Sequence, residues 1–246
     1  MPNTPNTAAT GFSPRPSWPR RPTARGFTLV EMSVVLVVIG LIIGAVAVGR
    51  DLQRNASYQR IASNFVQGWL MAYDAYATGT GIVPGDSATA PTGLVNGNTT
   101  ALCGAALLNT FLAAGIRLPE GRTEGQADRY AYLDSNGNPQ EVQVCFQNVT
   151  WAEPGASVGT YVARQRNVMV LRQLTPALAT LVDSQVDGSA DARFGRMRED
   201  SQAGLTAVVA NVPWSVDERM AIGSNTPTAL DESQVAVVNG WVLMSR

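Results

Sequence analysis

The sequence predicts an α+β protein, in which a long N-terminal helix packs on an antiparallel β-sheet head that also carries short extra helices. Three observations support this prediction. An apolar run over residues 27–48 continues into an amphipathic pattern at helical spacing. An Asn-Gly pair at 136–137 lies between two segments of alternating polar and apolar residues, which is typical of a β-hairpin. Thr175-Pro176 then has the form of a helix start.

The apolar run predicts a helix that crosses a membrane. Its 22 residues would span about 33 Å as a helix, close to the thickness of a bilayer's hydrocarbon core. A single segment in lipid must satisfy its backbone hydrogen bonds internally, and this favours a helix over a strand. Glu31 lies inside the run, where an acid is costly and usually has a function. We therefore assign residues 27–49 to a transmembrane helix.

An amphipathic continuation of this helix is expected over residues 50–78. One face carries large apolar residues at steps of three and four, as a helix that covers a protein core requires. An aromatic stripe of this kind indicates core packing rather than a ligand site. The stripe consists of Tyr58, Ile61, Phe65, Trp69, Tyr73 and Tyr76.

The first 26 residues have the composition of a targeting segment. They hold six of the 14 prolines and four of the 18 basic residues, and they contain no acid. Such a segment cannot bury enough apolar surface to fold. Its arginines favour the cytoplasmic side of a membrane, so the chain after residue 49 is expected to face outward. Residues 1–26 are thus predicted to be a leader, and residues 79–246 to form the head.

The composition argues against several kinds of function. All 18 basic residues are arginine, against 19 acids, and the chain has no His. This removes the commonest general base and the usual Schiff-base nucleophile. We find no nucleophile elbow, phosphate loop or paired-Cys metal motif, so no enzyme is expected, although chemistry that needs only carboxylates stays open. The slightly acidic balance gives no reason to expect nucleic-acid binding.

The stretch Arg25-Gly26-Phe27-Thr28-Leu29-Val30-Glu31-Met32 resembles the processing site of type IV prepilins and type II secretion pseudopilins. The resemblance implies a pilin-like fold, cleavage after Gly26 by a prepilin peptidase, N-methylation of Phe27 and a role for Glu31 in filament packing. Two other readings are an uncleaved signal anchor and a secretory signal cut after Ala45-Val46-Ala47. Neither of them explains the spacing of Gly26, Phe27 and Glu31.

The expected role of Glu31 follows from charge. Cleavage leaves a cationic amine on Phe27, and a charge buried among apolar helices needs a partner. The carboxylate of a neighbouring subunit could supply that partner and so set the axial register. The same acid also complements the positive end of its own helix.

The resemblance implies a structural subunit of a type IV pilus or a related filament, of the minor or pilin-like kind. Its partners would be the peptidase, other pilin subunits, the assembly machinery and the inner membrane, with the head in the periplasm before assembly into a filament. Two alternatives stay open. One is a tip or surface adhesin that binds a ligand through loops 79–98, 116–128 and 152–160. The other is a pseudopilin of a type II secretion system.

Two cysteines, Cys103 and Cys145, are expected to form one disulfide in an exported chain. The alternative is a pair of buried thiols. Cys145 alternates with Val142, Val144 and Phe146 and should therefore point away from them. Because Cys103 falls on the apolar stripe of a helix expected over residues 99–115, the bond would join that helix to the strand.

Further head elements follow from local patterns. The hairpin is expected to pair residues 130–133 with residues 141–151. Additional strands are expected at residues 167–171, 204–212 and 234–244, a helix at residues 175–186, and an irregular segment at residues 215–231. Tyr76 followed by Pro84-Gly85-Asp86 resembles a short motif of minor pilins.

Asp183, Asp187 and Asp191 place three carboxylates near one predicted bend. Calcium prefers several oxygen ligands from a flexible loop, so a calcium site here is the single cofactor that the sequence suggests. The EF-hand pattern does not match, because no terminal Glu lies at the required distance. The alternative is a helix end with solvated acids.

Overall fold

The computed structural model describes residues 26–97, 100–121, 126–209, 212–214 and 235–245. The chain divides into two compact units, residues 1–47 and residues 48–246. A long N-terminal helix is followed by an antiparallel β-sheet with a few extra helices, which confirms the predicted α+β fold. The predicted leader, apart from Gly26, lies outside the described residues, as does the irregular segment expected at residues 215–231.

The N-terminal helix has three parts. Helix α1 (Leu29–Arg60) passes into a π-helix (Ile61–Val66), and α2 (Gln67–Thr80) completes it. Gly81 ends α2 with a φ of 79°, a left-handed conformation that glycine adopts at little cost. Every member of the predicted stripe is at most 7% exposed, so its assignment to the core is confirmed.

The π-helix has a cause in the spacing of that stripe. Ile61, Phe65, Trp69 and Tyr73 follow one another at steps of four. Four residues of an α-helix turn by about 400°, so such a stripe drifts by about 40° at each step. A π-helix turns less per residue, because its hydrogen bonds close one residue later. The π segment thus offsets the drift and keeps the stripe against the sheet.

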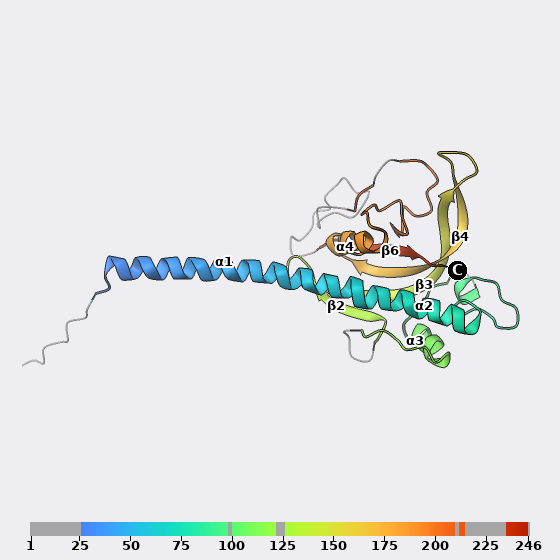
Figure 1. Cartoon of the computed structure of the whole chain (residues 1–246), viewed down its shortest axis with the longest axis horizontal. Helices are drawn as coiled ribbons and strands as arrows, with labels where there is room; N and C mark the ends of the chain where they lie inside the picture. Colours follow the sequence, from blue (N-terminus) through green and yellow to red (C-terminus); the bar gives the residue numbers. More distant parts are fainter. Residues whose placement is uncertain (1–25, 98–99, 122–125, 210–211, 215–234, 246) are drawn as a thin grey trace, which may run out of the picture. The chain divides into compact units, whose positions relative to one another are not determined.

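Six strands form one antiparallel sheet in the order β1-β3-β4-β6-β5, with β2 also paired to β3. The long hairpin of β3 and β4 is its centre, and the strand next to β4 comes from the end of the chain (Figure 1). The strands are β1 (Leu102–Cys103), β2 (Arg129–Leu133), β3 (Pro139–Pro154), β4 (Tyr161–Leu174), β5 (Met197–Glu199) and β6 (Val238–Leu243). The two remaining α-helices are α3 (Gly104–Ala113) and α4 (Pro176–Asp187).

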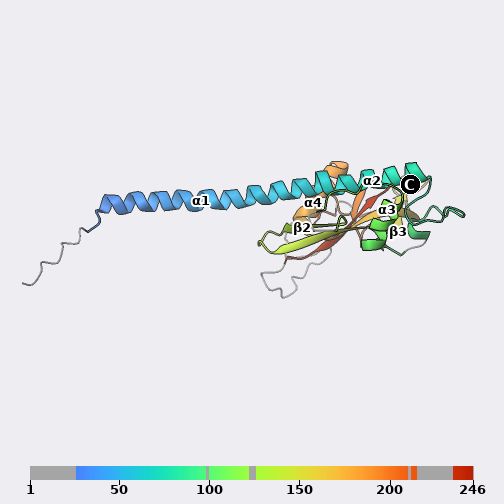
Figure 2. The same cartoon turned by 90° about the horizontal axis from the view of Figure 1, so that it is seen from below.

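The sheet has two different faces. On the inner face Val144, Phe146 and Met169 join the core formed by the stripe, α3 and α4. In Figures 1 and 2, α4 lies beside the π-helical part of the N-terminal helix, and α3 lies beside α2. On the outer face Val149 and Val170 belong to a second, smaller cluster. The alternation of side chains along each strand produces this division.

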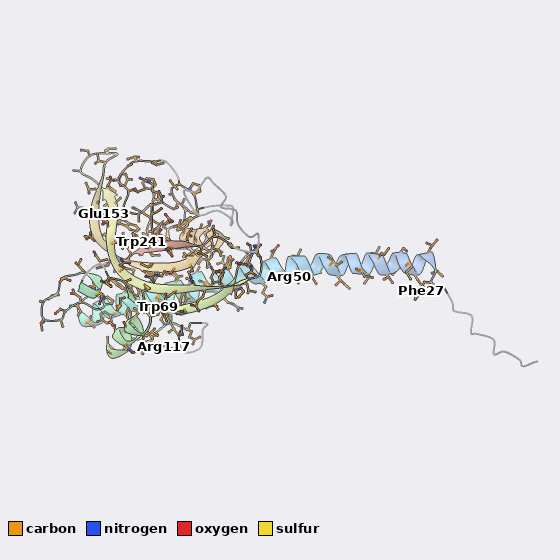
Figure 3. The ribbon with its side chains drawn as sticks, turned by 180° about the vertical axis from the view of Figure 1, so that it is seen from behind. Phe27, Arg50, Trp69, Arg117, Glu153 and Trp241 are labelled. Atoms are coloured by element: carbon orange, nitrogen blue, oxygen red, sulfur yellow. A yellow bond between two sulfur atoms is a disulfide. The ribbon has the colours of Figure 1, made fainter. Side chains whose placement is uncertain are left out.

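The segment after α3 packs closely against α2 and is held there by two contacts. A Cβ atom at Gly68 would lie 2.9 Å from Cβ of Pro119, so glycine lets the segment after α3 cross α2 at this point. The indole nitrogen of Trp69, labelled in Figure 3, donates to the carbonyl of Ala127 at 3.2 Å.

Several element predictions are confirmed. The hairpin turns at Gly137, and β2 pairs with β3 from Arg129 opposite Gln143 to Leu133 opposite Pro139. Helix α4 begins as expected, with Pro176 at its first position and the side chain of Thr175 accepting a hydrogen bond from the Leu178 amide. The strands expected at residues 167–171 and 234–244 correspond to β4 and β6.

Two predictions are wrong. The helix expected from residue 99 begins at Gly104, because residues 102–103 pair with β3 as strand β1. Cys103 therefore lies in β1, just before α3, and not on the helix stripe. The strand expected at residues 204–212 is absent from its described residues, 204–209 and 212. There the guanidinium of Arg193 donates to the carbonyls of Leu205 and Ala207.

Candidate processing and assembly site

The predicted cleavage site lies immediately before α1. Gly26, Phe27 and Thr28 are outside any helix or strand, and helical structure begins at Leu29. Phe27, labelled in Figure 3, is 78% exposed. No described atom comes within 4 Å of a Cβ built on Gly26. The Gly26–Phe27 bond therefore lies outside regular structure and is accessible, as a peptidase substrate must be.

Glu31 forms a capping box with Thr28. One carboxylate oxygen of Glu31 accepts from the backbone N–H of Thr28 at 2.9 Å and from its hydroxyl at 3.0 Å. In return the hydroxyl of Thr28 accepts from the backbone N–H of Glu31 at 3.2 Å. This reciprocal arrangement satisfies amides that the helix itself leaves unpaired. Glu31 thus has an intramolecular partner one residue from the predicted new N-terminus.

Sequence reasoning found Glu31 and missed Thr28. The signal was present, since Thr28-Leu29-Val30-Glu31 fits the capping-box pattern of Ser or Thr followed three residues later by Glu. From the sequence, the carboxylate was expected to pair with an amine and to complement the positive end of its own helix. The structure adds that it begins its own helix.

The apolar part of α1 exposes its side chains on all sides. Leu29 is 90% exposed and Ile43 is 64% exposed. By length and composition this is a helix that can cross a membrane, with a mean hydropathy of 2.8 over its most apolar window. Large apolar side chains left exposed all around a helix require lipid or other helices as their surroundings.

An exposed Gly-Phe bond outside regular structure, an acid capped at the start of the helix and an apolar exterior fit the N-terminal segment of the type IV pilin class, which includes the pseudopilins. Residues 21–47 match the prokaryotic N-terminal methylation motif, the signature of that class. This motif marks a structural class rather than a catalytic one, and it implies processing by a prepilin peptidase. No curated protein and no solved structure matches the chain.

The predicted disulfide is confirmed. Cys103 and Cys145 are bonded and face each other directly across β1 and β3, with Cα atoms 4.6 Å apart. Cys145 lies in the outer cluster, away from Val144 and Phe146, as its position in the strand predicted. The bond therefore holds the strand that precedes α3 to the centre of the sheet.

Loss of this bond is expected to weaken the head considerably. Replacing both cysteines with alanine should lower the free energy of unfolding by about 3–4 kcal/mol, because the bond closes a loop with a sequence separation of 42. Urea unfolding of the purified full chain, followed by tryptophan fluorescence, measures this. Reductant should destabilise the wild type to a similar extent and leave the variant unchanged. Equal stability of the two oxidised proteins would contradict the prediction.

The tyrosine and the Pro-Gly-Asp turn that resemble a minor-pilin motif meet in the structure. Burial raises the pKa of Tyr76, and a backbone hydrogen bond with Gly85 opposes this shift. The carboxylate of Asp86 accepts from the backbone amides of Thr92 and Gly93, each at 2.8 Å. Burial alone would raise the pKa of Asp86, but its hydrogen bonds outweigh that effect and lower it. Asp86 thus organises the loop that follows α2.

The three aspartates considered for calcium are used by the fold. Oδ2 of Asp183 accepts from the Asp191 amide at 2.8 Å and from the indole N–H of Trp214 at 2.6 Å. Oδ2 of Asp187 accepts from the Arg196 amide at 2.8 Å. Sequence reasoning missed Trp214, because no local pattern connects it to α4.

Each carboxylate therefore faces backbone or indole donors. In the described part of the chain, no group of three or more His, Cys, Asp or Glu side chains is placed to hold a metal ion. A calcium site at Asp183, Asp187 and Asp191 stays a prediction. Calorimetric titration of the full chain with calcium tests it, and neither heat nor a shift of the melting temperature is expected if hydrogen bonding is their whole role.

Proposed function

We propose that this chain is a structural subunit of a type IV pilus or a related filament. It would enter the inner membrane as a prepilin, lose its leader after Gly26, be N-methylated at Phe27 and assemble by packing of its N-terminal helices. The observation that carries the proposal is the position of the capped carboxylate of Glu31, four residues after Phe27 and inside the apolar part of α1.

The physical sequence of events follows from these groups. In the membrane, lipid surrounds the apolar side chains and Thr28 holds the carboxylate. After cleavage, the ammonium of Phe27 is a cation beside an apolar helix. In a filament, neighbouring helices replace lipid, and a carboxylate from one subunit can pair with the ammonium of the next. Contacts of this head-to-tail kind extend without closing into a ring, which is how filaments form.

Two alternative roles share the same N-terminal chemistry. A pseudopilin would assemble into a periplasmic fibre of a secretion system, and an adhesin would use its head to bind a ligand. Filament counts in a deletion strain separate them. Loss of filaments supports the structural subunit, normal filaments without attachment support the adhesin, and loss of protein secretion alone supports the pseudopilin.

Replacement of Gly26 by leucine is expected to leave an uncut precursor in the membrane. The reason is that a side chain at this position occupies the space that a peptidase needs next to the scissile bond. Mass spectrometry of the protein from its native host measures the N-terminus, which should be N-methylphenylalanine at position 27 in the wild type.

Gly40→Leu is the matched control. No described atom lies within 4 Å of a Cβ at either glycine, so both variants add a leucine to open space. Gly40→Leu should be processed normally. A mature wild-type N-terminus near residues 48–50, as a secretory signal would give, would contradict the proposed function.

A further inference from the structure

The part of the β3–β4 hairpin nearest its turn has a free strand edge. Strand β6 pairs with residues 168–174 of β4, whereas β3 pairs with β4 as far as Tyr161. The last bond between β6 and β4 runs from the Met244 amide to the Asn167 carbonyl, at 3.0 Å. In Figure 1 the turn end of the hairpin extends beyond β6. Within the described chain, residues 161–166 of β4 therefore have a neighbouring strand on one side only.

The ladder shows which backbone groups point to the free side. In an antiparallel strand the N–H and C=O of successive residues face opposite neighbours. The carbonyl of Asn167 faces β6, so the backbone groups of Gln165 and Ala163 point to the same side, past the end of β6. No described residue forms a hydrogen bond with these groups. Residues 162–166 are all exposed, so these donors and acceptors are open to a partner.

The other edge of the same hairpin is covered. The backbone amide of Ala152 in β3 donates to the carbonyl of Ala203 at 2.8 Å. The guanidinium of Arg198 donates to the carbonyl of Ala152, also at 2.8 Å, and lies over the ring of Trp151. The segment after β5 thus holds β3 in place. A hairpin fixed in this way loses little entropy when a further strand joins β4.

An excess of positive charge lies beside the free edge. The side chains of Arg164 and Arg166 share one face of the hairpin with Glu153, which Figure 3 labels. Glu153 accepts two hydrogen bonds from Arg166, and its carboxylate lies 3.6 Å from Nε of Arg164. Two guanidinium groups therefore share one carboxylate. Their side chains are 62% exposed for Arg164 and 46% exposed for Arg166, so both can meet a further anion.

These charges restrict which strand can join the edge. Side chains at every second position of an added strand would lie on the same face as Arg164 and Arg166. Opposite charges on neighbouring strands attract, and like charges repel. Two copies of this chain joined through the edge would place arginines beside arginines. An acidic segment of another protein has the complementary charge.

We propose that residues 161–166 of β4 bind an extended segment of another protein that carries acidic side chains at alternate positions. The segment adds a strand to the sheet. The backbone groups of Ala163 and Gln165 supply the hydrogen bonds, and Arg164 and Arg166 select the acidic side chains. This binding is independent of N-terminal processing and of helix packing, so it gives the head a partner of defined chemistry in a pilus or in a secretion fibre.

Fluorescence anisotropy on the full chain in a zwitterionic detergent tests the proposal. The probe is a short labelled peptide that alternates threonine and glutamate. One control peptide has lysine in place of glutamate, and another is the glutamate peptide with its backbone nitrogens methylated. We expect the wild type to bind the unmodified glutamate peptide alone. Methylation removes the N–H donors and keeps the charge, so this control detects binding to arginines elsewhere in the chain.

A pair of variants at Gln165 separates backbone from side chain. Proline is tolerated on an edge strand where its position faces solvent, and at residue 165 it removes the outward N–H and no bond to β3. Gln165→Pro should weaken binding of the glutamate peptide about tenfold, because the added strand loses a main-chain bond. Gln165→Ala keeps the backbone and should bind as the wild type does. Arg164→Glu should weaken binding of the glutamate peptide and favour the lysine peptide.

Each outcome has one meaning. If Gln165→Pro does not fold, Ala163→Pro and the methylated peptide test the same backbone contact. No binding of the glutamate peptide to the wild type, or equal binding of the methylated peptide, would overturn the proposal. Self-association of the wild type that Gln165→Pro abolishes, measured by analytical ultracentrifugation, would overturn it as well, since the edge would then belong to a second copy. None of these results affects the processing site, which mass spectrometry of the N-terminus tests separately.

Discussion

Glu31→Val is expected to be cleaved after Gly26 and yet to be almost absent from filaments. The variant keeps the Gly26–Phe27 bond and makes the helix more apolar, so membrane insertion and processing should continue. It removes the carboxylate that would pair with the ammonium of Phe27 on a neighbouring subunit. An unpaired charge among apolar helices is strongly unfavourable. We expect at least a tenfold loss of the chain from sheared filaments, measured by immunoblot against the membrane fraction.

Two further variants separate the two roles of Glu31. Thr28→Val removes the capping hydroxyl and keeps the carboxylate, so it should cost about 1 kcal/mol of helix stability and leave most assembly intact. Glu31→Gln retains an acceptor for the cap and removes the charge, so it should assemble as poorly as Glu31→Val. If Glu31→Gln assembled normally and Thr28→Val did not, the carboxylate would serve the helix cap rather than the contact between subunits.

Asp183→Asn is expected to stabilise the head at alkaline pH. Asp183 is completely buried, and burial raises its pKa to about 7. The hydrogen bond from Trp214 opposes this shift, whereas the nearby charge of Asp187 adds to it. One oxygen, Oδ1, has no hydrogen-bond donor. The protonated acid suits this environment, because its O–H can donate toward Asp187 while Oδ2 accepts from Trp214.

The direction of the pH effect follows from the raised pKa. Below about pH 4 the Asp183 side chain is protonated in both the folded and the unfolded states. The folded state then holds no buried charge at this position, and the stability that the neutral acid contributes is fully present. That contribution is lost progressively from about pH 4 and is fully lost once the pH rises past about 7, because the unfolded chain ionises first and the folded state finally holds a buried charge. The loss amounts to up to about 4 kcal/mol. An asparagine keeps the acceptor and the donor without the charge.

Urea unfolding of the full chain at pH 5 and pH 8 measures this prediction. Asp183→Asn should have the higher free energy of unfolding at pH 8 and a clearly smaller advantage at pH 5. Some pH dependence should remain, because burial and the neighbouring Asp200 also raise the pKa of Glu199. Asp51→Asn, an exposed control in α1, should follow the wild type. A wild-type pH profile in Asp183→Asn would show that the buried acid does not titrate in this range.

Structural features that depend on residues close together in the sequence could be predicted from it. The helix, the Asn-Gly hairpin and the Thr-Pro start of α4 depend on residues within a few positions of one another. The processing site is equally local, since Gly26, Phe27 and Glu31 lie within six residues. The outer orientation of Cys145 followed from the alternation of a single strand.

Other features depend on contacts between distant segments. Cys103 was placed on a helix because its neighbours are apolar, but pairing with β3 makes it part of a strand. The segment after α4 has no periodicity, and Asp183, Arg193 and Arg198 hold it through bonds to backbone groups and to Trp214. A pattern read along the chain contains no information on such partners.

The sequence by itself determined the N-terminal methylation motif, the apolar helix and the α+β class, because each rests on composition or on spacing within one segment. The tertiary structure alone decided the register that places Cys103 opposite Cys145 and the burial that raises the pKa of Asp183. Each of these depends on which atoms of remote segments come within a few ångströms, and that is settled only when the sheet and its helices pack together.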